Sequence, residues 1–435
     1  MNANQIQRPI GFSPSEISSM INEEVVAQHA EDAAFLWLLR DSAAKAPNYK
    51  LKDLADLDER VEANIDGLRV AGDTGWDFSK QLMDKDEPGS IFSTAVLALE
   101  GEDTVKIQMV YEKVESNPEF SDELIAAFGW VEARFLQGKV HGLLVSSSLF
   151  WRRLGISACV THRVNPKNYL KMVLDDKDLL LRARALRAVG ELGLKEYAAK
   201  LKEAVRSDDD HCCFWASWSG LLIGEFGSAL PILRKIAESD SSFNSKALVI
   251  AVRAMDTKDA YSWLKEFAKK PDRIRDAIEG TAAVGDPVFM PWLVKQMEVP
   301  EFACVAGEAF ASITGVDIEY EDLDGERSEE VDMGPNDNPE DENVKMDQDE
   351  DLPLPDPILI QQWWDNHKQQ FMTCKRYLMG KEINNKNLIT VLLQGNQRQR
   401  AAAAIELKIL KPKMPLFEIR APAKRQLKLL NSWTS

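Results

Sequence analysis

Residues 181–193 read Leu-Arg-Ala-Arg-Ala-Leu-Arg-Ala-Val-Gly-Glu-Leu-Gly, a helix-forming run that closes on a glycine. Ala185 lies eight residues before Gly193, and a pair with this spacing recurs at steps of 31, 31, 30 and 30 residues. The small residues of the five pairs are Ala185, Ala216, Ala247, Ala277 and Gly307, and the residues at the break are Gly193, Gly224, Met255, Gly285 and Gly315. This recurrence predicts an array of structural repeats.

Each repeat is expected to be a pair of helices. The small residue lets the first helix approach its neighbour closely, and the glycine supplies the left-handed backbone conformation that ends that helix. A second apolar helix follows the break at 197–205, 229–236, 260–267 and 288–297. Because one helical hairpin cannot bury its apolar face alone, the hairpins are expected to stack. The pattern therefore predicts an all-α, HEAT-like solenoid over residues 150–315.

The sequence before the array also indicates helices. Residues 51–68 carry an aliphatic side chain at every third or fourth position, which is the pattern of an amphipathic helix. We expect N-terminal helices over residues 1–77 and irregular helical repeats over residues 78–149. Within the second of these segments, one helix is predicted at 90–116 and another at 121–137.

The sequence after the array changes sharply in charge. Residues 316–351 contain 17 acidic and two basic residues, whereas residues 375–435 contain 13 basic and three acidic ones. Residues 316–357 also contain five prolines and few aromatic residues, so they are expected to be a disordered acidic linker. Residues 358–435 are expected to form a C-terminal helical cap that packs on the solenoid, beginning with a helix at 358–380.

Part of this expected cap is similar to one of the repeats. Residues 391–407 resemble residues 173–192 when a loop two residues shorter is allowed. The likeness predicts that one detached repeat lies in the C-terminal segment.

The overall charge bears on the partners of the chain. Its 435 residues hold 53 Lys and Arg against 70 Asp and Glu, a net charge of −17, whereas nucleic acids and anionic membranes need a cationic surface. No stretch approaches the roughly 18 apolar residues of a membrane span. Five cysteines in so long a chain fit reduced thiols. We expect a cytoplasmic protein that binds neither nucleic acid nor membrane.

The chain is also expected to lack catalytic activity. Its five histidines fall in separate segments, and none of the common nucleophile, metalloprotease or phosphate-binding motifs occurs. His211, Cys212 and Cys213 are adjacent, but consecutive helical side chains point about 100° apart. We therefore expect no metal and no cofactor, and the chain is predicted not to be an enzyme.

Tryptophan and arginine are the residue types that most often anchor protein interfaces, and they give the candidate binding residues. Trp76 lies between Gly75 and Asp77 outside the repeats, and consecutive Trp363 and Trp364 are not expected to face the same core. Arg182, Arg184 and Arg187, in the helix predicted within residues 181–193, are expected to line a polar inner ridge of the array. The candidates are Trp76, Arg182, Arg184, Arg187, Trp363, Trp364, Arg398 and Arg400, of which Trp76, Trp364, Arg398 and Arg400 are expected to be exposed.

Several segments carry a family resemblance. Residues 26–40, 54–60, 66–72, 182–187, 363–364 and 398–400 resemble a bacterial HEAT-like family whose genes lie beside type VI secretion components, among them PAAR-like spike-tip proteins. The resemblance covers the chain except its acidic segment. It implies a secretion context in the bacterial cytoplasm and a protein partner, and it carries no catalytic residue over to this chain.

Two functions follow from the array and the resemblance together. The first is a non-catalytic accessory, adaptor or chaperone, that binds a type VI secretion spike-tip protein or effector. The alternative is an immunity protein that neutralises a cognate type VI secretion toxin. Both would use an extended protein-binding surface, and they differ in the partner.

Overall fold

A computed structural model describes residues 21–326 and 349–434 of the chain. Within these residues the fold is all-α, with helices α2 to α23 and one antiparallel pair of short strands, β1 Tyr377–Leu378 and β2 Lys381–Glu382. The chain divides into two compact units. One contains the described residues up to Arg40 together with Asp56–Leu136, and the other contains Asp41–Ala55 and the described residues from Gln137 onward.

The first unit is a group of helices around an aromatic core. Trp37 stacks on Phe92 with ring centroids 4.7 Å apart, and Trp130 meets Phe92 edge-on at 5.4 Å. The division between the units runs through α2 and α3. The helices are α2 Glu23–Ala43, α3 Leu51–Ala71, α4 Asp73–Asp84, α5 Pro88–Glu100, α6 Thr104–Ser116 and α7 Ser121–Trp130, with short η1 Pro118–Phe120 and η2 Ala133–Leu136.

The single helix predicted at 90–116 is wrong. Helix α5 ends at Glu100, Glu102 adopts a positive φ of 54°, and α6 begins after Asp103. The Asp103 side chain accepts hydrogen bonds from the backbone N–H groups of Val105 and Lys106. This N-cap satisfies donors that a continuous helix would have paired internally, and it fixes the start of a separate helix.

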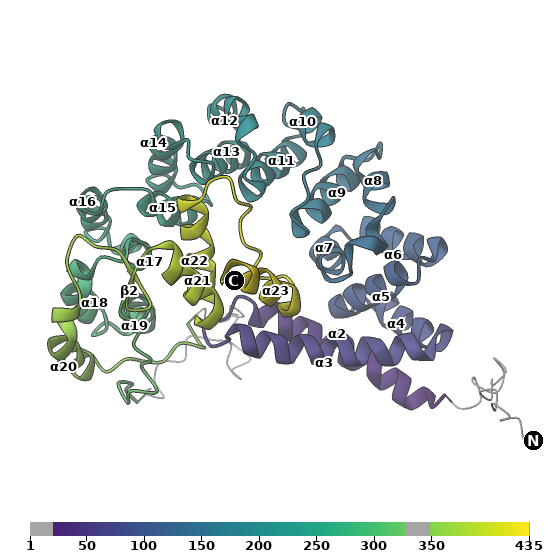
Figure 1. The fold of residues 1–435 in the computed structure, drawn as a ribbon, viewed down its shortest axis with the longest axis horizontal. Coiled ribbons are helices and arrows are strands. Elements are labelled where there is room, and N and C mark those ends of the chain that lie inside the picture. The colour runs from purple at the N-terminus through teal and green to yellow at the C-terminus, as the bar shows by residue number, and fades with distance from the viewer. Residues whose placement is uncertain (1–20, 327–348, 435) are drawn as a thin grey trace, which may run out of the picture. The chain divides into compact units, whose positions relative to one another are not determined.

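The second unit contains the helical repeats. Neighbours in the series α9, α11, α13, α15, α17 and α19 pack against each other, and α10, α12, α14, α16 and α18 lie outside this row (Figure 1). The arrangement is solenoid-like. The helices are α8 Lys139–Leu144, α9 Leu149–Thr161, α10 Asn168–Val173, α11 Leu179–Leu192, α12 Ala198–Ala204, α13 Asp210–Leu222, α14 Phe226–Ala237, α15 Asn244–Arg253, α16 Thr257–Phe267, α17 Ile274–Val284, α18 Met290–Gln296 and α19 Pro300–Thr314, with η3 Lys195–Tyr197, η4 Pro271–Arg273 and η5 Pro287–Phe289.

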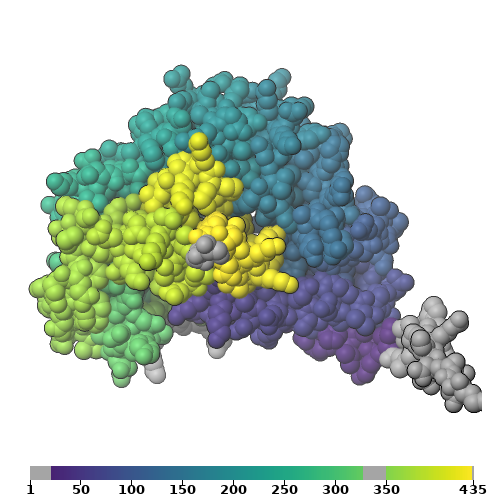
Figure 2. All heavy atoms as spheres, in the orientation of Figure 1, coloured from purple at the N-terminus to yellow at the C-terminus, as the bar shows by residue number. Residues whose placement is uncertain are grey.

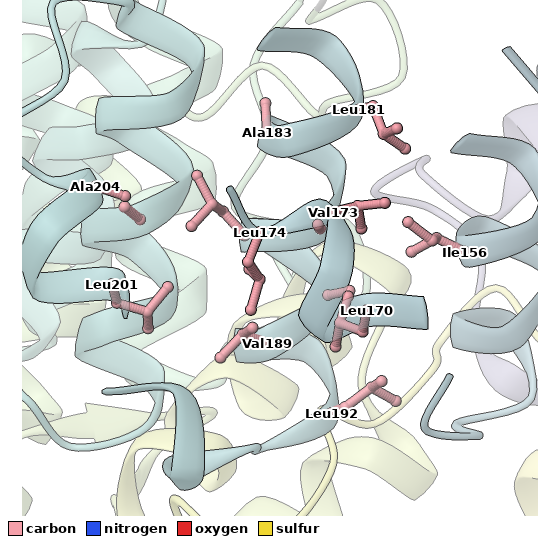
Figure 3. Close-up of a cluster of buried hydrophobic side chains, with 14 of the residues drawn as sticks. Ile156, Leu170, Val173, Leu174, Leu181, Ala183, Val189, Leu192, Leu201 and Ala204 are labelled. Atoms are coloured by element: carbon pink, nitrogen blue, oxygen red, sulfur yellow. The ribbon is translucent and has the colours of Figure 1, made fainter. Parts of the chain in front are cut away.

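The structure confirms that the repeated glycines end helices. Gly193, Gly285 and Gly315 are left-handed caps of α11, α17 and α19, and Gly224 has φ 90° after α13. The small residues before them are buried; Ala216, for example, is 0% exposed. Figure 3 shows one core of the array, in which aliphatic side chains of α10, α11 and α12 point toward one another. Small residues and glycines therefore allow the close packing that the spacing predicted.

The C-terminal segment is made of α20 Pro357–His367, η6 Lys368–Gln370, the two strands, α21 Asn385–Gln394, α22 Gln397–Leu410 and α23 Ala423–Thr434. The helix predicted at 358–380 is wrong beyond His367, because Cys374 and Met379 adopt positive φ on either side of β1. Helices α21 and α22 pack against each other as a pair.

This segment lies along the glycine ends of the repeats. A Cβ added at Gly285 would lie 2.4 Å from the Tyr377 carbonyl oxygen, and one at Gly315 would lie 2.6 Å from the Met379 carbonyl carbon. Figure 2 shows yellow C-terminal residues against the teal repeats. In this segment the Leu416 N–H donates to the Glu191 carbonyl at 2.7 Å. The segment packs on the solenoid, as expected, but across several repeats rather than only at its end.

Both ends of the segment expected to be a disordered acidic linker belong to the folded structure. Ile318 and Leu323 lie in the core formed with α18, α19 and α20, and Leu352 is 3% exposed. These apolar side chains are buried in the core, where removal of their surface from water is favourable, although acidic residues surround them in the sequence. The rest of the segment predicted at 316–357, namely residues 327–348, lies outside the described residues.

Candidate functional site

Trp76 lines a pocket of the first unit with a volume of about 620 Å³. Residues of α3, α4, α5, α6 and η2, with the turns between them, form its walls. The lining residues are Glu62, Leu68, Arg69, Gly72, Asp73, Trp76, Leu97, Glu100, Gly101, Asp103, Lys106, Glu132, Arg134 and Phe135.

Gly75 places Trp76 in this pocket. A Cβ at Gly75 would lie 2.2 Å from the Leu68 carbonyl oxygen, so only glycine lets α4 lie this close to α3. Trp76 follows directly and is 7% exposed. The expectation that Trp76 is exposed is therefore wrong, because its indole is held in the wall between the two helices.

Arg69 holds three carboxylates together at one side of the pocket. Its guanidinium donates to Glu62 at 2.7 Å and to Glu100 at 2.8 Å, and it also pairs with Asp66. Burial alone would lower the pKa of Arg69, but the hydrogen bond and charge of Glu62, with the charge of Glu100 and the hydrogen bond to Asp66, raise it above its usual range. The Glu62 carboxylate also accepts a 2.9 Å hydrogen bond from the indole N–H of Trp130.

Lys106 covers the face of Trp76. Its Nζ lies 5.0 Å from the centre of the indole ring and donates to Asp73 at 2.9 Å. The Asp73 side chain is 95% exposed and that of Lys106 is 25% exposed. An ammonium over an indole face is a cation–π contact, so the face of Trp76 already carries a cation of the chain itself.

The charge of the lining is negative. Its five carboxylates, on Glu62, Asp73, Glu100, Asp103 and Glu132, exceed its three basic side chains, on Arg69, Lys106 and Arg134. Burial raises the pKa of Glu100, an effect that Arg69 opposes and that Glu62 and Asp66 reinforce. An aromatic wall beside excess carboxylates suits a cationic group.

The predicted polar ridge exists in part on α11 of the second unit. Arg184 donates to Glu191 at 2.8 Å and to the Ser157 hydroxyl at 2.8 Å, and Arg187 donates to Glu191 at 2.9 Å. Burial acts to raise the pKa of Glu191, but Arg184, Arg187 and Arg163 lower it below its usual range. The structure thus brings two of the three predicted arginines together on one carboxylate.

Arg187 and Arg182 differ in their surroundings. The Arg187 side chain is 45% exposed, and its guanidinium lies 4.5 Å from the centre of the Trp215 ring. Arg182 lies near Cys212. Burial and Asp209 raise the pKa of the Cys212 thiol to about 12, and the charge of Arg182 opposes this rise. The predicted ridge therefore contains Arg184 and Arg187 without Arg182.

The two consecutive tryptophans contact the same residue. Trp363 and Trp364 have ring centroids 5.8 Å and 6.2 Å from that of Phe310, and Trp364 is 8% exposed. The expectations that they cannot face one core and that Trp364 is exposed are wrong, because α20 packs on a core wide enough to take both rings. Trp363 also stacks on His367 at 4.1 Å.

The two C-terminal arginines make contacts within the protein. Arg400 is 0% exposed and donates to the Leu392 carbonyl at 2.8 Å and to Gln397 at 2.7 Å, so the expectation that it is exposed is wrong. It joins α21 to α22. Arg398 is partly exposed and pairs with Glu308 at 2.8 Å. Whether either residue binds a partner stays a prediction.

The adjacent thiols point apart. Cys212 Sγ donates to the Leu179 carbonyl at 3.5 Å, and Cys213 Sγ donates to the Val205 carbonyl at 3.4 Å. The His211 ring instead meets Phe243 edge-on at 5.0 Å. Among the residues that the structure describes, no three His, Cys, Asp or Glu side chains form a group that could hold a metal ion. In the same residues, no helix is both long and apolar enough to cross a membrane.

Sequence reasoning missed most of the pocket. Arg69, Glu100 and Lys106 belong to three helices, and no periodicity relates them. One local signal was available, because Glu62 and Asp66 precede Arg69 by seven and three residues and so share a helix face with it. A comparison of the chain with models of known protein families and with characterised proteins finds no match.

Proposed function

We propose that this chain is a non-catalytic protein-binding accessory, an adaptor or chaperone that holds a type VI secretion spike-tip protein or effector in the bacterial cytoplasm. The observation that carries the proposal is the stacking of helical pairs from α9 to α19. A stacked array presents a surface that lengthens with every repeat, and such arrays commonly bind extended protein partners. The resemblance of residues 26–40 and 182–187 to the bacterial HEAT-like family encoded beside type VI secretion components supports the secretion context.

Arg187 is the best-placed anchor on the array. Glu191 fixes its guanidinium at 2.9 Å and Trp215 supports it from below, while nearly half of its side chain remains exposed. An arginine already held in one conformation loses little freedom when a partner binds. Arginines of this kind often contribute a large share of the affinity of an interface.

The test is co-purification of the tagged chain with the spike-tip protein and the effector encoded beside it. We expect one of them to remain bound at a fixed ratio, and Arg187→Ala to weaken that binding at least tenfold. Arg206→Ala, at another exposed arginine of the same unit, is the matched control and should bind normally. Recovery of neither protein would overturn the proposal, and rescue of toxin-producing cells without spike-tip binding would favour immunity.

A further inference from the structure

The pocket of the first unit resembles a binding site for a cationic side chain whose place is held by Lys106. Lys106 lies over Trp76, and the carboxylate with which it forms an ion pair there, that of Asp73, is on a side chain that is 95% exposed. An ion pair with so exposed a carboxylate contributes little to stability, because water screens the two charges. The Lys106 ammonium can therefore leave the indole face at small cost.

We propose that this pocket binds an arginine side chain of the partner protein, which displaces Lys106 from the face of Trp76. The inference rests on the proposed function, because it supposes a protein partner. A guanidinium is planar, stacks on an indole face, and donates to carboxylates through a fixed fork. Trp76 offers the face, and Glu62 and Glu100 lie in the same lining.

The charges favour an arginine over a neutral or acidic group. Arg69 neutralises only one of the three carboxylates that it holds, so negative charge remains beside the pocket. Asp103 lies in the same wall and accepts from the backbone of α6. An arginine that enters in place of Lys106 leaves the total charge of the pocket unchanged, while the freed Lys106 ammonium becomes hydrated.

The test uses N-acetyl-arginine amide as the probe and N-acetyl-citrulline amide as its neutral isostere, followed by saturation-transfer NMR on the full chain. We expect saturation of the arginine probe only, with binding that weakens as salt rises. Lys106→Met should strengthen binding at least threefold, because it removes the ammonium that competes with the probe for the indole face. Lys113→Met, at the other α6 lysine that pairs with an aspartate, is the matched control and should change nothing.

A second pair of variants keeps the inference testable if the pocket rearranges. Trp76→Phe keeps an aromatic ring of weaker quadrupole and should weaken binding of the arginine probe about threefold, whereas Trp76→Leu should abolish it in a chain of normal helix content. Equal binding of the arginine and citrulline probes, or no effect of Lys106→Met, would overturn the inference. Partner capture by a chain that ignores the arginine probe overturns the pocket alone. Arginine binding without partner capture overturns the proposed function and the partner's role in this inference.

Discussion

Gly285 and Gly224 occupy the same position in different repeats but differ in their neighbours. Both have positive φ, at 73° and 90°, yet the Tyr377 carbonyl oxygen is 2.4 Å from a Cβ at Gly285, whereas the nearest atom to a Cβ at Gly224 is 3.5 Å away. Gly224→Ala should therefore lower the free energy of unfolding by about 1–2 kcal/mol, because alanine tolerates the left-handed conformation less well than glycine. Gly285→Ala should carry the same cost and lower the free energy of unfolding by a further amount of about 1–3 kcal/mol, because its methyl group overpacks the contact with Tyr377.

Chemical denaturation of the two variants measures this difference. Gly285→Ala is expected to be clearly less stable than Gly224→Ala. Equal free energies of unfolding would show that the C-terminal segment does not press on the end of α17.

Lys408 should make the stability of the protein depend on pH. It is 1% exposed, and its Nζ donates to the carbonyls of Pro412 and Met414 at 2.7 Å and 2.6 Å. Burial, with the charges of Lys195 and Arg163, lowers its pKa to about 7. Between pH 7 and the usual lysine pKa, Lys408 therefore binds more protons in the unfolded chain than in the folded one. The contribution of Lys408 to the free energy of unfolding accordingly rises with pH over this range.

The comparison that isolates this effect is between the protein and Lys408→Met. The stability difference between them, wild type minus variant, should rise by on the order of 1 kcal/mol per pH unit from pH 7 to pH 9. Lys411→Met, at an exposed lysine nearby, should show no such trend. A constant difference for Lys408→Met would mean that the ammonium is not buried as described.

At the scale of single elements, the seam between neighbouring helices depends on small side chains. Ala216 lies on α13 in the core that joins it to α11, and it is 0% exposed. Ala216→Phe should cost about 1–3 kcal/mol, because the added ring forces the helices apart. Lys235→Phe, at an exposed position of α14, is the control. An unchanged melting curve for Ala216→Phe would contradict the assigned packing.

The elements also show which features were predictable from the sequence. The helix ends at Gly193 and Gly315 were predictable, because the preference of glycine for the left-handed conformation is local and depends only on residue type. The break before α6 was missed because the Asp103 cap competes with an apolar pattern that continues on both sides. The contact of Tyr377 with Gly285 was beyond reach, because the two residues lie far apart in the chain and no period links them.

The candidate residues divide in the same way. Trp76 was selected for its type and does line the pocket, but its burial depends on Gly75 fitting against α3. Arg400 was selected for its type too, and it is enclosed by α21 and α22. Residue type therefore indicated which side chains make strong contacts, whereas only the tertiary structure distinguishes a contact within the chain from a free surface.

At the scale of the whole second unit, a buried ion-pair group ties the C-terminal segment to the repeats. Glu406 is 1% exposed and accepts from Arg253 at 2.7 Å and from Arg376 at 2.5 Å. Burial lowers the pKa of Arg253, and Glu406 opposes that effect. Removing the one carboxylate leaves two cations without compensation, which typically costs about 3–5 kcal/mol.

Glu406→Gln should therefore lower the free energy of unfolding by that amount while the helix content of the folded state is retained. Glu382→Gln, at a carboxylate of the same segment whose side chain is 44% exposed, should have little effect. A Glu406→Gln protein as stable as the wild type would contradict the view that this group fastens the segment.

The proposed function, that the chain holds another protein, can be measured by size-exclusion chromatography with light scattering. The purified chain would be mixed with a purified type VI secretion spike-tip protein and, separately, with a purified effector of such a system. We expect one stable complex of fixed stoichiometry, in which the partner keeps its covalent mass. Elution of the chain apart from both proteins, or a covalent change in either of them, would show that the proposed function is wrong.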